Sequence, residues 1–147
     1  MRKFVLFILL TICSYPLLAQ QQDRIVIYSD KAPKPIGPYS QGILTGNTLY
    51  LAGQIAKIPE TGGMDTLNIV SEIRRVFSNL GAVLNAAGMG YTNLVKTTVY
   101  CTDINNFNAI NAVYGEYFKD NFPARETIQV VALPGKAHVE ISGIAVK

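Results

Sequence analysis

Apolar residues between positions 68 and 87 are spaced three and four apart, which is the period of a helix that buries one face. Gly88 follows the last of them and marks the expected end of this helix. A similar spacing covers residues 105–118, where Asp103 is a candidate N-cap. The pattern therefore predicts two amphipathic helices. The apolar positions of the first are Ile69, Ile73, Val76, Phe77, Leu80, Val83, Leu84 and Ala87, and those of the second are Phe107, Ile110, Tyr114, Tyr117 and Phe118.

Runs of β-branched and apolar residues predict strands in the remaining chain. Gly46 and Asn47 mark a tight hairpin between the second and third strands, and the turn PGKA joins the last two. Strands linked through a helix prefer to lie parallel, whereas hairpins pair antiparallel. The order β-β-β-α-β-α-β-β therefore predicts an α+β fold, a mixed sheet with both helices on one face. The expected strands cover 24–29, 41–44, 48–54, 94–101, 127–133 and 138–146.

The second face of this sheet has no element left to cover it. Some strands are nevertheless apolar on both faces, as Val130 and Val131 indicate. The sheet is then either partly exposed or covered by other copies of the chain, and we favour self-association.

The N-terminus, MRKFVLFILLTICSYPLLAQQQ, has the charged start, apolar middle and small-residue end of a secretory signal peptide. We expect cleavage near Ala19 or Gln20, which gives a signal peptide at 1–20 and one domain at 21–147. A retained membrane anchor is the alternative, although Phe4 to Ala19 is shorter than the roughly 20 residues of a membrane span. The expected location is outside the cytoplasm, in the periplasm, and it is cytoplasmic only if this interpretation is wrong.

Charge and composition exclude several classes of function. Without Arg2 and Lys3 the chain keeps 11 basic residues against 10 acidic ones, which argues against binding to nucleic acid or, after cleavage, to a membrane. Cys101 has no cysteine partner once Cys13 is removed, and His138 is the only histidine. The chain also has no metal-ligand spacing, phosphate loop or dinucleotide fingerprint, so neither a metal nor another cofactor is expected.

Arg125 stands at the start of FPARETIQVVAL, a run that otherwise has the character of an inner strand. A buried guanidinium keeps its charge and needs an anion. One interpretation is a clamp for the carboxylate of a small organic acid, and Pro123 would fix how the chain enters the strand. The other is a structural ion pair or an arginine that reaches solvent at a sheet edge.

Three further residues have a structural and a functional interpretation. Glu140 alternates with Val139 and Ile141, so it lies either on a wet sheet face or, if another subunit covers that face, in a site where burial makes it a general acid or base. Tyr39 in GPYSQG either packs under a loop or directs its phenol into a pocket. Asn111 interrupts the apolar side of the second helix and needs a hydrogen-bond partner, usually a backbone amide.

The motifs APKPIGPYSQG, YLAGQI, VKTTVYCTD, FNAINAVYGEYF, FPAR and VEISGIAV occur in this order over residues 32–146. Together they resemble the RidA (YjgF) family. The resemblance implies a chorismate-mutase-like α+β fold and a homotrimer with active sites between subunits. It also implies an enzyme without a cofactor that hydrolyses small reactive enamines and imines, such as 2-aminoacrylate, 2-iminopropanoate and 2-iminobutanoate, to 2-keto acids and ammonia.

By this resemblance, Arg125 binds the substrate carboxylate and Glu140 is the catalytic acid–base. Tyr39, Gly53 and Asn111 line the cleft, and a backbone carbonyl near Thr127 helps to orient the attacking water. The chain differs from residues that are common in the family at several positions, which bears on the substrate more than on the reaction class. These positions are Ala52, Ala56, Glu126, Thr127 and Ser142.

Two other functions remain open from the sequence. One is a non-catalytic ligand-binding or chaperone-like role of the same fold. The other is RNA cleavage, which the near-neutral charge and the signal peptide disfavour because phosphate contacts need clustered cations.

Overall fold

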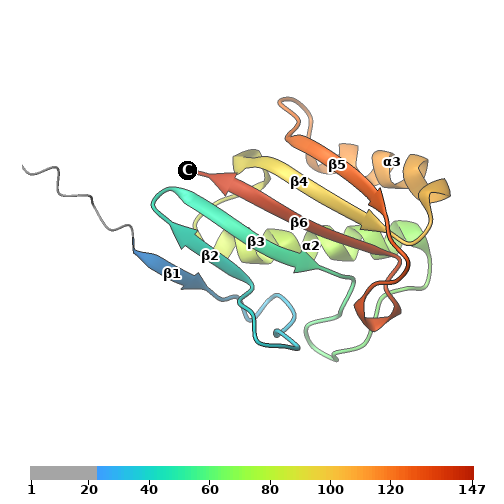
Figure 1. The fold of residues 1–147 in the computed structure, drawn as a ribbon, viewed down its shortest axis with the longest axis horizontal. Helices are drawn as coiled ribbons and strands as arrows, with labels where there is room; N and C mark the ends of the chain where they lie inside the picture. Colours follow the sequence, from blue (N-terminus) through green and yellow to red (C-terminus); the bar gives the residue numbers. More distant parts are fainter. Residues whose placement is uncertain (1–22) are drawn as a thin grey trace, which may run out of the picture.

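The computed structural model describes residues 23–147, which form one six-stranded sheet and two α-helices (Figure 1). The strands lie in the order β1-β2-β3-β6-β4-β5. The expected signal peptide falls on residues outside this range. The strands are β1 (Arg24–Ile27), β2 (Gly42–Thr45), β3 (Thr48–Gln54), β4 (Leu94–Cys101), β5 (Ala124–Gln129) and β6 (Val139–Val146), and the helices are α2 (Ile69–Ala86) and α3 (Phe107–Tyr117).

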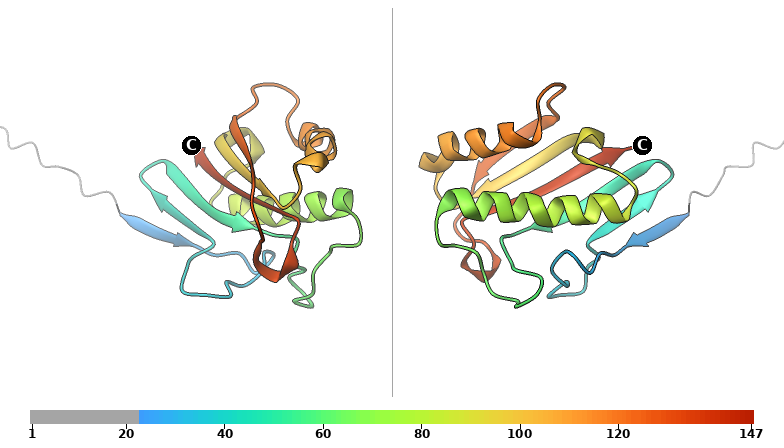
Figure 2. Two further views of the ribbon diagram at one scale, coloured as in Figure 1. Left: turned by 45° about the vertical axis from the view of Figure 1, so that its right-hand side comes forward. Right: turned by 180° about the vertical axis from the view of Figure 1, so that it is seen from behind.

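The sheet is mixed, as the order of the elements predicts. Strand β1 pairs antiparallel with β2, β2 with β3, and β3 with β6. Strand β4 also pairs antiparallel with β6, on its other side. Only β4 and β5, which are joined through α3, run parallel. Both helices lie on the same face of the sheet, as Figure 2 shows from behind. The predicted α+β architecture with helices on one face is therefore confirmed.

Helix α2 forms where its spacing predicts and provides the largest part of the core. The side chain of Asn68 caps it by accepting a hydrogen bond from the amide of Ser71 at 2.9 Å. Gly88 ends it in a left-handed conformation, with φ of 69°. The fully buried residues of its inner face include Ile73, Val76, Phe77, Leu80, Val83 and Leu84. Each such side chain contributes about 1.5–3 kcal/mol by leaving water.

Strand β5 differs from the sequence prediction in its limits and in its place. It covers Ala124–Gln129 instead of 127–133, and it is an edge strand instead of an inner one. The reason lies in the pairing order, since β6 occupies the other side of β4. Val131, which the pattern placed in the strand, lies beyond its end and is fully exposed.

The second helix begins with a short 3₁₀ turn, Ile104–Asn106, before α3. Asp103 caps this turn by accepting a hydrogen bond from the amide of Asn105 at 2.9 Å, as expected.

Within the described residues, no helix is long and apolar enough to cross a membrane.

The face of the sheet opposite the helices carries partly exposed side chains along its central strands. Along β6, Val139, Ile141 and Ala145 are buried under the helices, whereas Glu140 and Ser142 alternate with them and stay partly exposed. No described element lies over this face (Figure 1). We call it the open face. It is the uncovered face that the order of elements predicts.

Candidate functional site

The guanidinium of Arg125 is held on the helix side of the sheet edge. Its Nη2 donates a hydrogen bond to Oδ1 of Asn111 at 2.7 Å. Its Cζ lies 4.7 Å from the ring centre of Tyr114 and 5.6 Å from that of Phe107, two residues of α3. Both distances allow attraction between the cation and the aromatic face. Helix α3 therefore fixes Arg125 through a neutral amide and two rings.

These contacts leave the charge of Arg125 without an anion from the described part of the chain. Among residues 23–147, no carboxylate lies within 4.0 Å of its nitrogens. Burial raises the pKa of the Tyr114 phenol, which bonds the hydroxyl of Thr97 at 2.8 Å, so the tyrosine stays neutral and supplies no anion. The expected partner of Asn111 was a backbone amide, and this was wrong: its partner is the guanidinium. We call Arg125, Asn111, Phe107 and Tyr114 the arginine half-site.

Glu140 lies on the open face, in a pocket of about 310 Å³ that also includes Tyr39 and Gly53. Burial raises the pKa of the Glu140 carboxyl above its ordinary value. No ion pair or hydrogen bond to its side chain occurs within residues 23–147. The carboxylate is thus half-buried, unpaired and able to hold a proton nearer to neutral pH. The pocket is completed by Ile36, Ala52, Ile55 and Pro134.

Gly53 has to be a glycine for the carboxylate to take this position. A Cβ at residue 53 would overlap the carboxyl group of Glu140, so any other residue would displace one of the two. We call Glu140, Gly53 and Tyr39 the glutamate half-site. Tyr39 is about half exposed and lines the pocket, where the sequence allowed a packed tyrosine as the alternative.

Gln41 holds the loop that carries Tyr39, a role that sequence reasoning missed. Its side chain is buried and accepts from the amide of Ser29 at 2.7 Å. Its Nε2 donates to the carbonyls of Ser29 at 3.0 Å and Pro33 at 2.9 Å. The Gln41 side chain thus joins the two ends of the segment from Ser29 to Pro33, which precedes Tyr39 on the chain. The signal for this role in the sequence was a polar side chain, Gln41, within a predicted strand.

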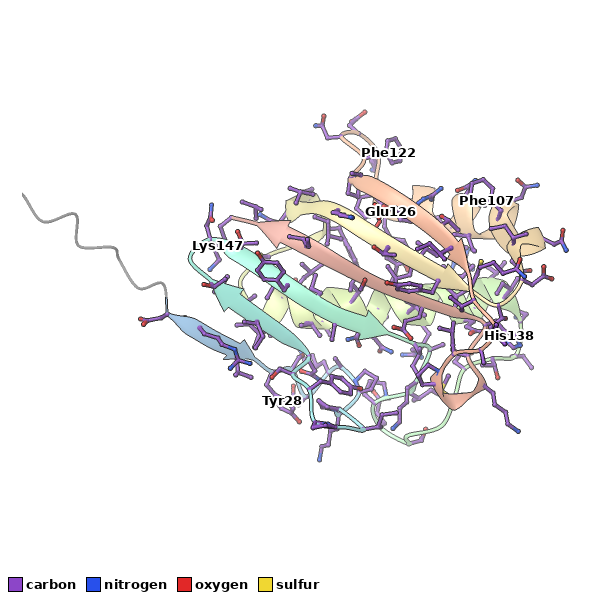
Figure 3. The ribbon with its side chains drawn as sticks, in the orientation of Figure 1. Tyr28, Phe107, Phe122, Glu126, His138 and Lys147 are labelled. Carbon is purple, nitrogen blue, oxygen red and sulfur yellow. The ribbon has the colours of Figure 1, made fainter. Side chains whose placement is uncertain are left out.

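Glu72 holds His138 and Val139, the two residues that precede Glu140, and this role was also missed. Its buried carboxylate accepts from the amides of His138 at 2.6 Å and Val139 at 3.1 Å, and its Oε2 lies 2.8 Å from Nδ1 of His138. The imidazole of His138 is about half exposed, at the end of the sheet marked in Figure 3. A charged residue on the apolar side of a predicted helix was the signal, because a buried charge needs such partners.

The two half-sites lie on opposite faces of the same sheet. Arg125 pairs in register with Thr97, whose side chain is buried on the helix side. Glu140 pairs with Tyr100, which lies on the open face. Because paired residues project to the same side of a sheet, the two charges of one chain point apart. One chain therefore brings Tyr39, Gly53 and Glu140 together on one face. It brings Arg125 and Asn111 together on the other.

Residues 126 and 127 follow the alternation of β5. Glu126 points to the open face, where Nζ of Lys96 lies 2.9 Å from it, so it does not compete for Arg125 (Figure 3). Lys96 keeps the pKa of this carboxyl below its ordinary value. Thr127 shares the face of Arg125, and its buried hydroxyl has no hydrogen-bond partner within the described chain. Across residues 23–147, no group of three His, Cys, Asp or Glu side chains is placed to hold a metal ion.

The chain is similar in sequence and structure to known proteins. The family model described as Endoribonuclease L-PSP matches residues 29–147. The human 2-iminobutanoate/2-iminopropanoate deaminase is 46% identical over 124 residues, which are 84% of this chain and 90% of the human protein. A Rid-family protein of Yersinia pestis, YyfA, is 44% identical, and its structure has a TM-score of 0.83 over 85% of this chain and 100% of that one.

A third relative has been solved with a small molecule. The structure of E. coli TdcF with bound serine has a TM-score of 0.80 and 36% identity, and the match covers 84% of this chain and 98% of that one. Relatives of this kind match nearly their whole length. The chain therefore belongs to the Endoribonuclease L-PSP family, which includes RidA and YjgF.

Proposed function

We propose that the protein hydrolyses small 2-imino acids, such as 2-iminopropanoate and 2-iminobutanoate, to 2-keto acids and ammonia. The observation that carries the proposal is a pair of unmatched charges. Within residues 23–147, Arg125 has no acid and Glu140 has no base. A 2-imino acid has a carboxylate for the first and an electrophilic carbon and a basic nitrogen for the second. The names of curated relatives at 44–46% identity support the same reaction.

In the proposed reaction, Arg125 binds the substrate carboxylate through two parallel hydrogen bonds. This contact places the C=N carbon against a water next to Glu140. Glu140 takes a proton from the water as its oxygen bonds to that carbon. It then gives this proton to the imine nitrogen, and the product is a carbinolamine. The carbinolamine hydroxyl next loses its proton to Glu140, which passes it to the nitrogen, so that the C=O bond forms as the C–N bond breaks and ammonia leaves a 2-keto acid. The raised pKa of the Glu140 carboxyl favours both transfers near neutral pH.

The active site would be assembled from two copies of the chain. Arg125 and Glu140 of one copy point to opposite faces, so they meet only if the arginine half-site of one copy faces the glutamate half-site of another. The uncovered open face supports such an assembly, and a closed ring of three copies with three equivalent sites follows the family expectation. Asn111 and the backbone near Thr127 would enter the site with Arg125, and Tyr39 and Gly53 with Glu140.

A coupled assay tests the activity. An amino-acid oxidase generates the imine from L-alanine or L-2-aminobutanoate, and semicarbazide trapping measures how much imine remains. The protein should lower the trapped imine well below the level set by spontaneous hydrolysis, and Glu140→Gln should not. An unchanged imine level with folded wild-type protein would overturn the proposed function and favour a non-catalytic role.

The signal peptide carries a further proposal, that the chain acts outside the cytoplasm. Residues 1–20 combine two cations, an apolar stretch and small residues near Ala19. Mass spectrometry of the protein recovered from its native cell should give an N-terminus near residue 20 or 21. An intact Met1 in the cytoplasmic fraction would contradict it.

A further inference from the structure

Two lysines line a small hollow that continues the pocket of Glu140. Lys34 and Lys57 come from different loops, one before β2 and one after β3. The hollow and the pocket share four lining residues, so they form one recess with Glu140 at one end and the lysines at the other. The shared residues are Ile36, Tyr39, Gly53 and Ile55.

Buried amides anchor both lysine-bearing loops. Nε2 of Gln41 donates to the carbonyl of Pro33, next to Lys34, at 2.9 Å. Nδ2 of Asn79 donates to the carbonyls of Ile55 at 2.9 Å and Lys57 at 2.8 Å. Gln41 is 2% exposed and Asn79 is 0% exposed. The backbone that carries each lysine is therefore fixed before any ligand arrives, which lowers the ordering cost of binding.

The positive charges of the hollow are not compensated by the described chain. Neither Lys34 nor Lys57 has a carboxylate within 4.0 Å among residues 23–147. Asp65, which follows the residue that pairs with Lys57 across its loop, already faces Arg75 at 3.6 Å. Asp30 and Glu60 do not line the hollow. Two lysines line this one recess, and an anion bound there would be attracted by both positive charges.

We propose that this hollow binds a second carboxylate of the substrate, carried at the end of its side chain. The inference rests on the proposed imine hydrolysis. The preferred substrates are then 2-imino acids with an acidic side chain, of the glutamate type. Tyr39 and Ile55 flank the chain carbons between the imine and the second carboxylate. This assigns to Lys34 and Lys57 a role in specificity and none in the chemical step.

A pair of isosteric substrates tests the charge alone. An amino-acid oxidase generates the imines of glutamate and glutamine, which differ in a carboxylate against a neutral amide. The ratio of their kcat/KM values is measured for the wild type and for Lys34→Met with Lys57→Met. Lys119→Met, an exposed lysine beyond α3, is the matched control. The double substitution should lower kcat/KM for the glutamate imine about tenfold, since each partly exposed contact contributes modestly, and leave the glutamine imine within about twofold.

The outcomes separate this inference from the proposed function. Hydrolysis of both imines with a ratio that the double substitution leaves unchanged overturns the lysine subsite alone. If the wild type hydrolyses 2-iminobutanoate but neither of these two imines, the subsite is overturned and the proposed function stands. If it hydrolyses none of the three, the proposed function fails and calorimetry decides the subsite. Binding of 2-oxoglutarate that is tighter than that of 2-oxopentanoate, and weakened by the double substitution, supports it. Equal binding of 2-oxoglutarate and 2-oxopentanoate overturns the subsite. The subsite is also overturned if inorganic phosphate binds in a lysine-dependent way and 2-oxoglutarate is not preferred.

Discussion

The arginine and glutamate half-sites differ in how the fold treats a charge. Arg125 stands at a sheet edge, held by an amide oxygen and two aromatic rings of one helix. Glu140 stands on a central strand, with no polar partner in residues 23–147 and a pKa raised by burial. The first keeps its charge and is oriented, whereas the second is made ready to take and release a proton. In the proposed reaction, carboxylate binding and proton transfer therefore belong to separate surfaces of one chain.

Loss of the guanidinium should have the largest effect on activity. Arg125→Ala removes the only proposed contact to the substrate carboxylate, and truncating one member of such a charge pair costs about 2–5 kcal/mol. We expect a fall in kcat/KM of roughly a hundredfold or more, with assembly unchanged. Steady-state kinetics and light scattering measure the two. A variant that keeps near-wild-type kcat/KM would remove Arg125 from the site.

Gly53→Ala should reduce kcat strongly by acting on the other half-site. The added Cβ overlaps the Glu140 carboxyl, so the carboxylate has to leave its position. General acid–base catalysis by a positioned group contributes about 10²–10⁴-fold, and we expect most of it to be lost. Gly115→Ala is the matched control, because its Cβ meets no atom within 4 Å and the change favours helix α3. Equal kcat in the two variants would show that the crowding at Gly53 is harmless.

Asn111→Asp should weaken substrate binding without altering the glutamate half-site. The new carboxylate would stand 2.7 Å from the guanidinium, where Oδ1 now accepts its hydrogen bond, and would compete with the substrate. We expect KM to rise about tenfold or more, since a like charge at the site opposes the incoming carboxylate. Asn108→Asp, an exposed change on the same helix, is the control. A KM that rises equally in both would point to a general charge effect.

The smallest effect is on stability and depends on pH. Because the folded-state pKa of Glu140 is raised, the folded chain holds this proton more tightly than the unfolded chain does. The resulting stabilisation is complete below the unfolded pKa and is lost as pH rises through the folded pKa. Glu140→Gln should therefore raise Tm near pH 7.5 and give no advantage near pH 4.

A control glutamate should behave in the opposite way. The guanidinium of Arg74 lowers the pKa of the Glu116 carboxyl, with their closest atoms 2.6 Å apart. The stability from this pair is present above the unfolded pKa and is lost as pH falls through the folded pKa. Glu116→Gln should thus leave Tm near pH 7.5 unchanged or slightly lower. A Tm that rises in both variants would show that burial of Glu140 is not the cause.

The parts of the fold that follow local patterns could be predicted from the sequence. The spacing of apolar residues gave the limits of α2 to within one or two residues, and Gly88 marked its end because a left-handed residue suits glycine. The place of β5 could not be predicted in this way. Whether a strand is inner or at the edge depends on which strands pair with it. The apolar residues Val130 and Val131 are compatible with either place, so the local sequence does not distinguish them.

The site shows the same division between local and long-range information. The residues expected from the family motifs fall into two groups, each of which the fold brings together. The hydrogen bond from Arg125 to Asn111 joins residues 14 apart, and that from His138 to Glu72 joins residues 66 apart. No periodicity encodes such pairs. The roles of Gln41 and Glu72 therefore emerge only when the loops they hold are seen in place.

Mixing two inactive variants tests the central claim most directly. Arg125→Ala and Glu140→Gln are co-expressed or refolded together in equal amounts, and imine hydrolysis is compared with each variant alone. If every site takes its arginine from one copy and its glutamate from another, random assembly makes about one quarter of the sites intact, and about one quarter of the wild-type activity should return. Activity in the mixture no higher than in the separate variants, with mixed assemblies confirmed by native mass spectrometry, would contradict the account.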